Sequence, residues 1–388
     1  MKKLIAIAVV FALVAAGSVF AVDLGGEVIG NVGLLQGDNG DDSKVTGSAD
    51  LKRIRIQGEG EVGDGKFFGW FRAEGEGAAT GVVPGVWGHA GWKPIDQFKM
   101  WIGSNGGDGF FAKEGQTGWM FYQRTTDTKV TMGGANVWGW DGYNGYYAAI
   151  DPSFAWETNP AYLVTRNAFY GGGIDGANGL YLTISPVGMV NINFELPFFM
   201  NTEIGDIFKA LVAQVDLNFD FGNIAITYAG DHTDATNGKI FGYFNLASID
   251  RLSLDVGFSF TLPENDWMEP IAAGLGVKFD ITDAFGFKIR TALSFAGDDE
   301  IFAVLADALP YFAVNDNLKI FASLGLTMMS ADYFDNPFLG FHINPYVWIG
   351  QEWGPSFWAG FKLYGQKIPG ADKAAINWAI PIAIGVSF

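Results

Sequence analysis

The sequence contains no cysteine, and this absence alone excludes several kinds of protein. Without a thiol, the protein cannot form a disulfide framework, a zinc–thiolate centre or a cysteine nucleophile. Only three histidines occur, His89, His232 and His342. None has metal-ligand spacing or a serine-nucleophile motif nearby. We therefore expect no enzyme, no cofactor and no metal site.

Positive charge is also scarce, with 24 Lys and Arg against 42 Asp and Glu and a formal net charge of −18. Nucleic-acid binding needs a basic face, so this balance argues against it. An acidic surface instead suits loops that stay soluble outside a cell.

Long apolar runs are confined to the N-terminus, although 49% of the residues are hydrophobic. Met1, Lys2 and Lys3 precede the apolar stretch Leu4–Ala16, and the small-residue sequence Val19-Phe20-Ala21 follows. This pattern predicts a secretory signal peptide over residues 1–21, cleaved after Ala21. Beyond it no stretch reaches about 18 consecutive apolar residues, which excludes an ordinary helical membrane protein. We expect residues 22–388 to form one domain.

What the sequence does contain is alternation of apolar and polar residues with a period of two. Residues 214–221, 251–260 and 285–296 show it clearly; Leu252, Leu254, Val256, Phe258 and Phe260, for example, alternate with Arg251, Ser253, Asp255, Gly257 and Ser259. A period of two predicts β-strands. In a soluble sandwich the apolar face points inward, whereas in a membrane barrel it points to lipid, and the pattern alone does not separate the two.

The signal peptide, the terminal Phe388, the aromatic content of 15% and the many long strands together make this distinction. Ala374–Phe388 reads AAINWAIPIAIGVSF, with Ile376, Trp378, Ile380, Ile382, Ile384, Val386 and Phe388 on one face. The segment resembles the final strand of bacterial outer-membrane β-barrels of the porin kind. In those barrels the assembly machinery reads a terminal aromatic residue, usually Phe, and Phe388 matches it. The resemblance implies a transmembrane, antiparallel up-and-down barrel that contacts outer-membrane lipid and that can form a homotrimer.

Connectors between the expected strands alternate between short and long, as in an outer-membrane barrel with periplasmic turns and external loops. With both termini in the periplasm, the trace gives rising strands that begin near residues 24, 66, 97, 128, 188, 222, 251, 285, 317 and 353. Falling strands begin near 50, 84, 118, 178, 207, 239, 269, 300, 338 and 374. We therefore expect about 16–20 strands, with 20 in the trace, which is wide enough for an aqueous lumen.

The segment Leu51–Gly77 carries the densest charge. The charged residues Arg53, Arg55, Glu59, Glu61, Arg72, Glu74 and Glu76 share one expected face of a hairpin. A two-residue turn at Gly63-Asp64 would pair Arg53 with Glu74 and Arg55 with Arg72. Charges are costly in lipid, so this face must point into the lumen. It forms either a constriction that sorts solutes by charge or a solvated barrel wall.

A second feature is the long connector near residues 139–178, which is rich in aromatic residues including Trp140, Tyr143, Tyr146 and Trp156. Long ordered loops are usually functional. By resemblance to porins, this one either folds into the barrel and narrows it or packs on itself as an external cap.

Two motifs point away from binding chemistry. Gly58–Gly63 matches GxGxxG but leads into a hairpin and not into a helix, so it does not indicate a dinucleotide site. The loop with Asp38, Asn39, Asp41 and Asp42 lacks EF-hand spacing. The leading hypothesis is a channel for passive diffusion of small hydrophilic solutes. The alternatives are a selective transporter for sugars or hydrophobic molecules, and a surface protein or adhesin anchored by its barrel.

Overall fold

The computed structural model describes residues 21–38, 46–76, 83–103, 131–132, 135–136, 178–198, 204–209, 211–230, 238–261, 271–296, 301–331, 335–350, 355–367 and 370–387. The apolar leader, the loop aromatics Trp140, Tyr143, Tyr146 and Trp156, and the terminal Phe388 lie outside these described residues.

Strands make up nearly all of the described chain. They are β1 (Ala21–Asp38), β2 (Thr46–Val62), β3 (Phe67–Glu76), β4 (Val83–Ile95), β5 (Phe98–Gly103), β6 (Thr131–Met132), β7 (Ala135–Asn136), β8 (Asn178–Val187), β9 (Val190–Phe198), β10 (Val212–Phe219), β11 (Gly222–Ala229), β12 (Lys239–Ile249), β13 (Leu252–Thr261), β14 (Ile271–Asp280), β15 (Phe285–Ala296), β16 (Ile301–Asn315), β17 (Leu318–Ser330), β18 (Phe338–Gly350), β19 (Pro355–Gly360), β20 (Lys362–Lys367) and β21 (Ala375–Ser387). One short helix, α5 (Ile204–Lys209), precedes β10. In the part of the chain that is described, no helix has the length and apolar character to cross a membrane.

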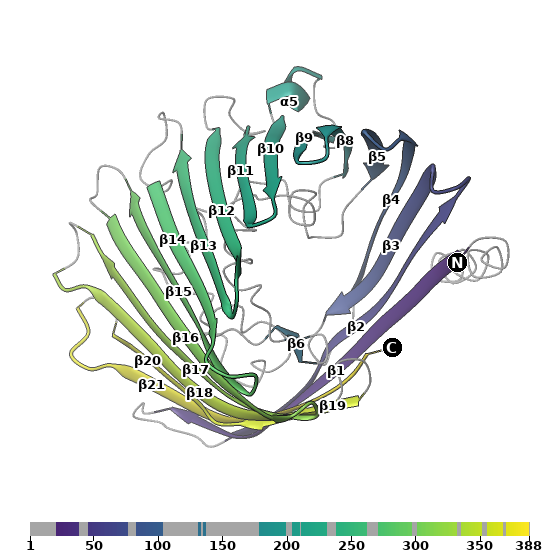
Figure 1. Ribbon diagram of the computed structural model, residues 1–388. Coiled ribbons are helices and arrows are strands. Elements are labelled where there is room, and N and C mark those ends of the chain that lie inside the picture. Colours follow the sequence, from purple (N-terminus) through teal and green to yellow (C-terminus); the bar gives the residue numbers. More distant parts are fainter. Residues whose placement is uncertain are drawn as a thin grey trace.

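The large sheet is antiparallel, and its pairings run full circle (Figure 1). Consecutive strands pair with one another, β5 pairs with β8, and the first strand, β1, pairs with the last, β21, from Glu27↔Ser387 to Asp38↔Asn377. The sheet therefore has no open edge at its ends, and the expected up-and-down β-barrel is confirmed. The separate hairpin β6–β7 is drawn inside the ring in Figure 1.

Within the described residues the sheet has 19 strands. Two of them, β19 and β20, follow one another between the same neighbours, β18 and β21. They are interrupted at Phe361, whose N–H donates to the carbonyl of Pro345 at 2.9 Å. Because proline has no N–H to return that bond, the ladder is broken there. Counted as one strand, the pair leaves eighteen positions round the ring.

The count lies within the expected range, but two strands of the 20-strand trace have no counterpart in the sheet. Those starts, near 118 and 128, lie outside the described residues. Over Phe98–Gly103, β5 pairs directly with β8, so no strand separates the two there. The other traced starts lie close to the observed strands.

The expected register of the β2–β3 hairpin is wrong by two residues. Arg53 pairs with Glu76, Arg55 with Glu74, and Val62 closes the hairpin with Phe67. The turn spans four residues, because Gly63, Asp64 and Gly65 all adopt positive φ (63°, 57° and 77°). Glycine and aspartate tolerate that region better than most residues. A shift of two keeps every side chain on its expected face.

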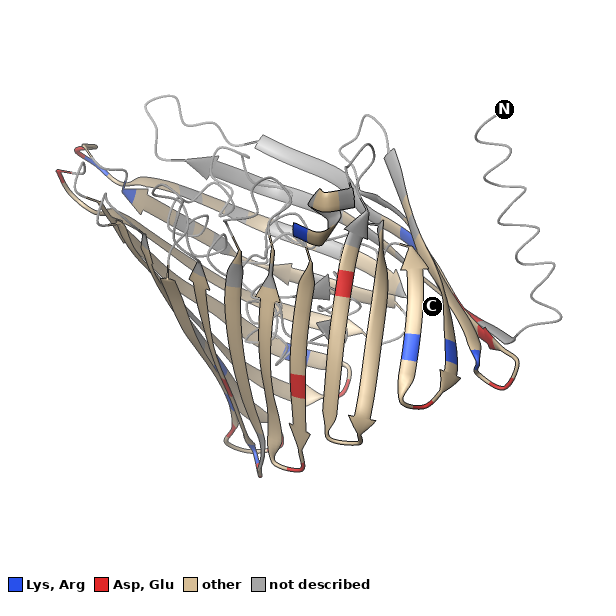
Figure 2. Cartoon of the chain, turned by 90° about the horizontal axis from the view of Figure 1, so that it is seen from above, with Lys and Arg blue, Asp and Glu red and all other residues tan. Residues whose placement is uncertain are grey.

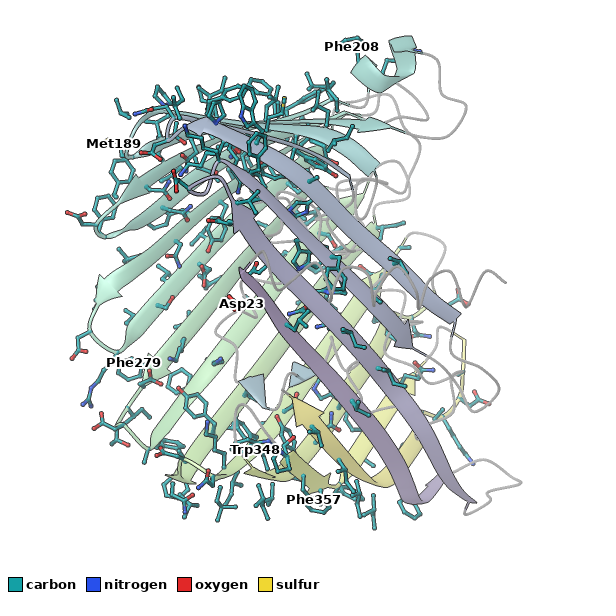
Figure 3. All side chains as sticks on the ribbon, turned by 90° about the vertical axis from the view of Figure 1, so that its right-hand side faces the viewer. Asp23, Met189, Phe208, Phe279, Trp348 and Phe357 are labelled. Carbon is teal, nitrogen blue, oxygen red and sulfur yellow. The ribbon has the colours of Figure 1, made fainter. Side chains whose placement is uncertain are left out.

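Side chains alternate between an apolar outer face and a more polar inner face. On the outside, Phe258 is 50% exposed and Phe295 is 53% exposed, while Asp255 and Ser294 on the same strands are buried. Figure 3 shows the contrast on adjoining strands, with Trp348 of β18 pointing into the ring and Phe357 of β19 pointing away. This is the inverse of a soluble sandwich and matches a membrane barrel.

Candidate functional site in the barrel wall

A cavity of about 670 Å³, called the lumen cavity below, lies on the inner face where β1–β5, β8 and β9 approach their short turns. Its lining combines carboxylates, ammonium groups, aromatic rings and small polar groups. These residues are Asp23, Glu59, Gly60, Glu61, Gly65, Phe68, Gly69, Trp70, His89, Lys93, Asp96, Lys99, Trp101, Thr183, Ser185 and Asn191. The lining is therefore polar and charged, as in an aqueous passage.

The acidic group of this cavity consists of Asp23, Glu59 and Glu61. Asp23, labelled at the start of β1 in Figure 3, is the register partner of Glu59 on β2. All three side chains are exposed, and none forms a hydrogen bond or ion pair with another described residue. Like charges on directly opposed strand positions repel. No cation of the described residues is paired with them, and they line the cavity.

Positive charge lies on β4 and β5. The Lys99 ammonium sits over two rings, 5.0 Å from the centre of Phe68 and 4.6 Å from that of Trp101. Lys93 pairs with Asp96 at 3.0 Å, an exposed pair that contributes little to stability. The cavity thus has an acidic side on β1 and β2 and a basic side on β4 and β5.

Farther from the β2–β3 turn than the lumen cavity, this hairpin holds a further cation in a fixed position. The Arg72 guanidinium lies 5.1 Å from the centre of the Trp70 ring, and its Nε donates to Oε1 of Gln57 at 3.3 Å. Stacking and a hydrogen bond fix the planar guanidinium more firmly than a single contact would.

Four rings, Trp70, His89, Trp101 and Tyr181, form an aromatic row across β3, β4, β5 and β8. Centroid separations along the row are 5.7, 6.0 and 5.5 Å, with interplanar angles of 26°, 36° and 20°. These separations are close to the spacing of adjacent strands. The rings therefore follow one another along the inner wall, and cations lie over two of them: Arg72 over Trp70 and Lys99 over Trp101.

Beyond Tyr181 the wall is held by buried polar side chains. Thr183 donates to Asn193 at 2.9 Å, Asn193 to Asp216 at 2.8 Å, Gln214 to Asp216 at 2.7 Å and Thr227 to Gln214 at 2.6 Å. A connected network of this kind fixes the positions of its members. It gives the β8–β11 side of the barrel a rigid polar inner surface.

The sequence-predicted residues of the charged hairpin are distributed as follows. Glu59 and Glu61 line the lumen cavity, and Arg55 and Arg72 lie on the same faces of β2 and β3. The backbone register places Arg53 opposite Glu76 and Arg55 opposite Glu74. That these seven residues form a constriction stays a prediction.

Several lining residues were not predicted as site residues: Asp23, Phe68, Trp70, His89, Lys99 and Trp101. For Lys99 and Trp101 the sequence did contain a signal. Lys99 and Trp101 share odd parity on β5, whereas Phe98, Met100 and Ile102 occupy even positions. The alternation in so short a strand is too brief to be read alone. No group of residues suited to a metal ion occurs among those that are described.

A closed antiparallel barrel with an apolar outer face and a charged cavity in its inner wall has the architecture of porin-like outer-membrane β-barrels. No protein-family model matches the sequence, and no curated protein matches it. Among solved structures, the anion-selective porin of Comamonas acidovorans is similar over 95% of this chain and 100% of its own, with a TM-score of 0.54 and 14% identity. OprD of Pseudomonas aeruginosa is similar over 95% of each chain, with a TM-score of 0.52 and 10% identity. At these identities the likeness establishes the fold.

Proposed function

We propose that this protein is an outer-membrane channel through which small hydrophilic solutes diffuse passively. The observation that supports it is the combination of a closed ring of strands, an apolar outer face and a charged cavity in the inner wall. The outer face suits the hydrocarbon core of a bilayer, and the inner wall suits water. Passage of this kind needs no cofactor and no covalent chemistry.

Charge is the feature of the wall that distinguishes one solute from another. Figure 2 shows acidic and basic residues in short bands on the strands and at the turns, with most of the sheet carrying neither. Rings or clusters of charged side chains sort ions by field strength at short range. The Comamonas porin is described as anion-selective, whereas the lumen cavity of this chain is lined by three carboxylates that form no ion pair with another described residue. Selectivity here follows from these residues and not from the likeness.

The proposal includes how the chain reaches and sits in the membrane. Residues 1–21 act as the leader, with cleavage after Ala21, the residue at which β1 begins. Both termini and the short turns lie on the periplasmic side, and the assembly machinery reads the last strand at Phe388. Lipid surrounds the outer face, and identical barrels associate as a homotrimer. Chemical cross-linking in native membranes would count the subunits.

The decisive experiment is conductance of the purified protein in planar bilayers, with the reversal potential measured in a salt gradient. We expect stepwise single-channel currents that scale with bulk salt conductivity, because the passage is aqueous. A folded, inserted barrel that conducts no ions would instead favour a surface protein or adhesin anchored by its barrel.

A further inference from the structure

We infer that the lumen cavity is a binding site for small zwitterions, solutes that carry an ammonium group and a carboxylate a few ångströms apart. The inference rests on the proposed function in that it names the substrate class of the same site. The solute's ammonium is held by Asp23, Glu59 and Glu61, and its carboxylate by Lys99.

Opposite charges converge on one residue, Phe68, from two sides. Glu61 of β2 is the register partner of Phe68 on β3. The Lys99 ammonium reaches back from β5 to lie 5.0 Å from the centre of the same Phe68 ring. Both residues line the cavity. Phe68 therefore forms an apolar floor between an anionic and a cationic wall.

Among the described residues, no ion pair joins the acidic wall to the cationic wall. Glu61 makes no ion pair with any described residue, and its Oε2 lies beside the turn residue Gly65. Strand spacing and side-chain reach place the opposed charges on the order of 5–10 Å apart. A dipeptide backbone, at about 3.3–3.6 Å per residue, spans this gap with its two charged ends.

The aromatic rings of the cavity favour a charged solute over a sugar. A sugar binds aromatic side chains through their open faces, but cations already lie over these rings: Lys99 over Phe68 and Trp101, and Arg72 over Trp70. Rings that hold a cation suit a carboxylate, which the cation attracts, and do not suit stacking of a sugar.

The remaining polar residues complete the cavity without adding charge. The Ser185 hydroxyl donates to Oδ1 of Asn191 at 2.7 Å, and Thr183 donates to Asn193 at 2.9 Å. These neutral groups lie next to Lys99, because Thr183 is its register partner on β8. They provide a polar surface for the amide between the two charged ends.

The test is calorimetric binding to the folded, detergent-solubilised full-length protein. Four probes of similar size separate the ligand classes: diglycine carries both charges, glycylglycinamide only the positive one, N-acetylglycine only the negative one, and N-acetylglycinamide neither. We expect diglycine to bind, and Glu59→Gln with Glu61→Gln to weaken that binding about threefold to tenfold, as expected for partly exposed charge pairs.

Lys99→Gln is the discriminating variant. It should weaken diglycine to a similar extent and leave glycylglycinamide unchanged or tighter. Lys319→Gln is its matched control, because that ammonium also lies over a ring, 5.1 Å from the centre of Trp348, but outside the cavity lining. Asp316→Asn, in the β16–β17 turn, is the control for loss of a carboxylate. Asp23→Asn tests the acidic side again from a different strand.

Three outcomes overturn the inference: diglycine that does not bind, diglycine binding that is insensitive to Lys99→Gln, and N-acetylglycinamide or glucose binding as tightly as diglycine. The second would indicate a site for cations alone. Binding without conductance would contradict the proposed channel and leave the zwitterion site in place. Conductance without diglycine binding would contradict the zwitterion site and leave the proposed channel in place.

Discussion

At the scale of single residues, the charges of the inner wall differ in how firmly they are held. Arg72 is fixed by the Trp70 ring and by Gln57, whereas Glu59 and Glu61 have no protein partner among the described residues. A fixed cation produces a local field of constant position, while a free carboxylate can follow a passing solute. Both kinds of charge act over roughly 8–10 Å at physiological salt.

Removing either sign should therefore change ion selectivity. Arg55→Gln with Arg72→Gln should shift the reversal potential toward cations, because the wall loses positive charge. Glu59→Gln with Glu61→Gln should shift it toward anions. Both shifts in reversal potential should shrink in concentrated salt, because the screening length becomes shorter. Reversal potentials of all variants that match the wild type would place these residues away from the ion path.

Single residues also report which face of β2 meets water. Glu59→Cys should react rapidly with a small, charged thiol reagent in intact membranes. Ile56→Cys should stay protected, since Ile56 is an outward-facing side chain, 46% exposed on the isolated barrel, where lipid would cover it. The chain has no cysteine of its own, so any labelling belongs to the introduced thiol. Reaction at position 56 with protection at position 59 would invert the assignment of inside and outside.

At the scale of elements, the short turns impose the tightest local requirements. Gly222 begins β11 with a φ of 154°, and a Cβ there would lie 1.8 Å from the carbonyl oxygen of Asn245 on β12. A side chain would force β11 and β12 apart, so glycine is required by both conformation and space.

Gly222→Ala should therefore destabilise the barrel by at least about 1–3 kcal/mol, the usual cost of a strained backbone position. The urea midpoint for loss of the folded, heat-modifiable gel band measures the effect. Gly188→Ala in the β8–β9 turn is the control, because nothing lies within 4 Å of the Cβ it would add. Equal midpoints for the two variants would contradict the tight approach of Gly222 to β12.

The sequence predicted the strands and their faces correctly, but not the register of the β2–β3 hairpin or the position of the lumen cavity. Alternation located the strands and their faces, because side chains on a strand repeat every two residues and lipid demands an unbroken apolar side. It did not set the β2–β3 register, which depends on three consecutive left-handed residues from Gly63 to Gly65. Nor did it locate the lumen cavity, since Lys99 and Trp101 meet Phe68 only after β3, β4 and β5 pair. That contact depends on how far the Lys99 side chain reaches across β4, which the alternation of residues does not show.

At the scale of the whole molecule, closure determines both stability and function. A strand without a partner exposes a row of N–H and C=O groups, which is prohibitive in lipid, so the pairing of β1 with β21 is the step that makes the sheet compatible with a membrane. It also encloses the charged inner wall. The absence of native cysteine allows this seam to be tested directly.

Val28 of β1 and Val386 of β21 are register partners across the seam, and both point outward with exposures of 38% and 42%. Val28→Cys with Val386→Cys should form a disulfide under mild oxidation, because directly opposed strand residues bring their Cβ atoms to about 4.5–5.5 Å. The cross-linked chain should migrate faster than the reduced chain on a denaturing gel, since its two ends are joined.

Val28→Cys with Ile382→Cys is the control. Four residues along a strand add about 13 Å, which is too far for a disulfide. Cross-linking in the control but not in the matched pair would shift the seam register, and its absence in both would show that the ring does not close between β1 and β21.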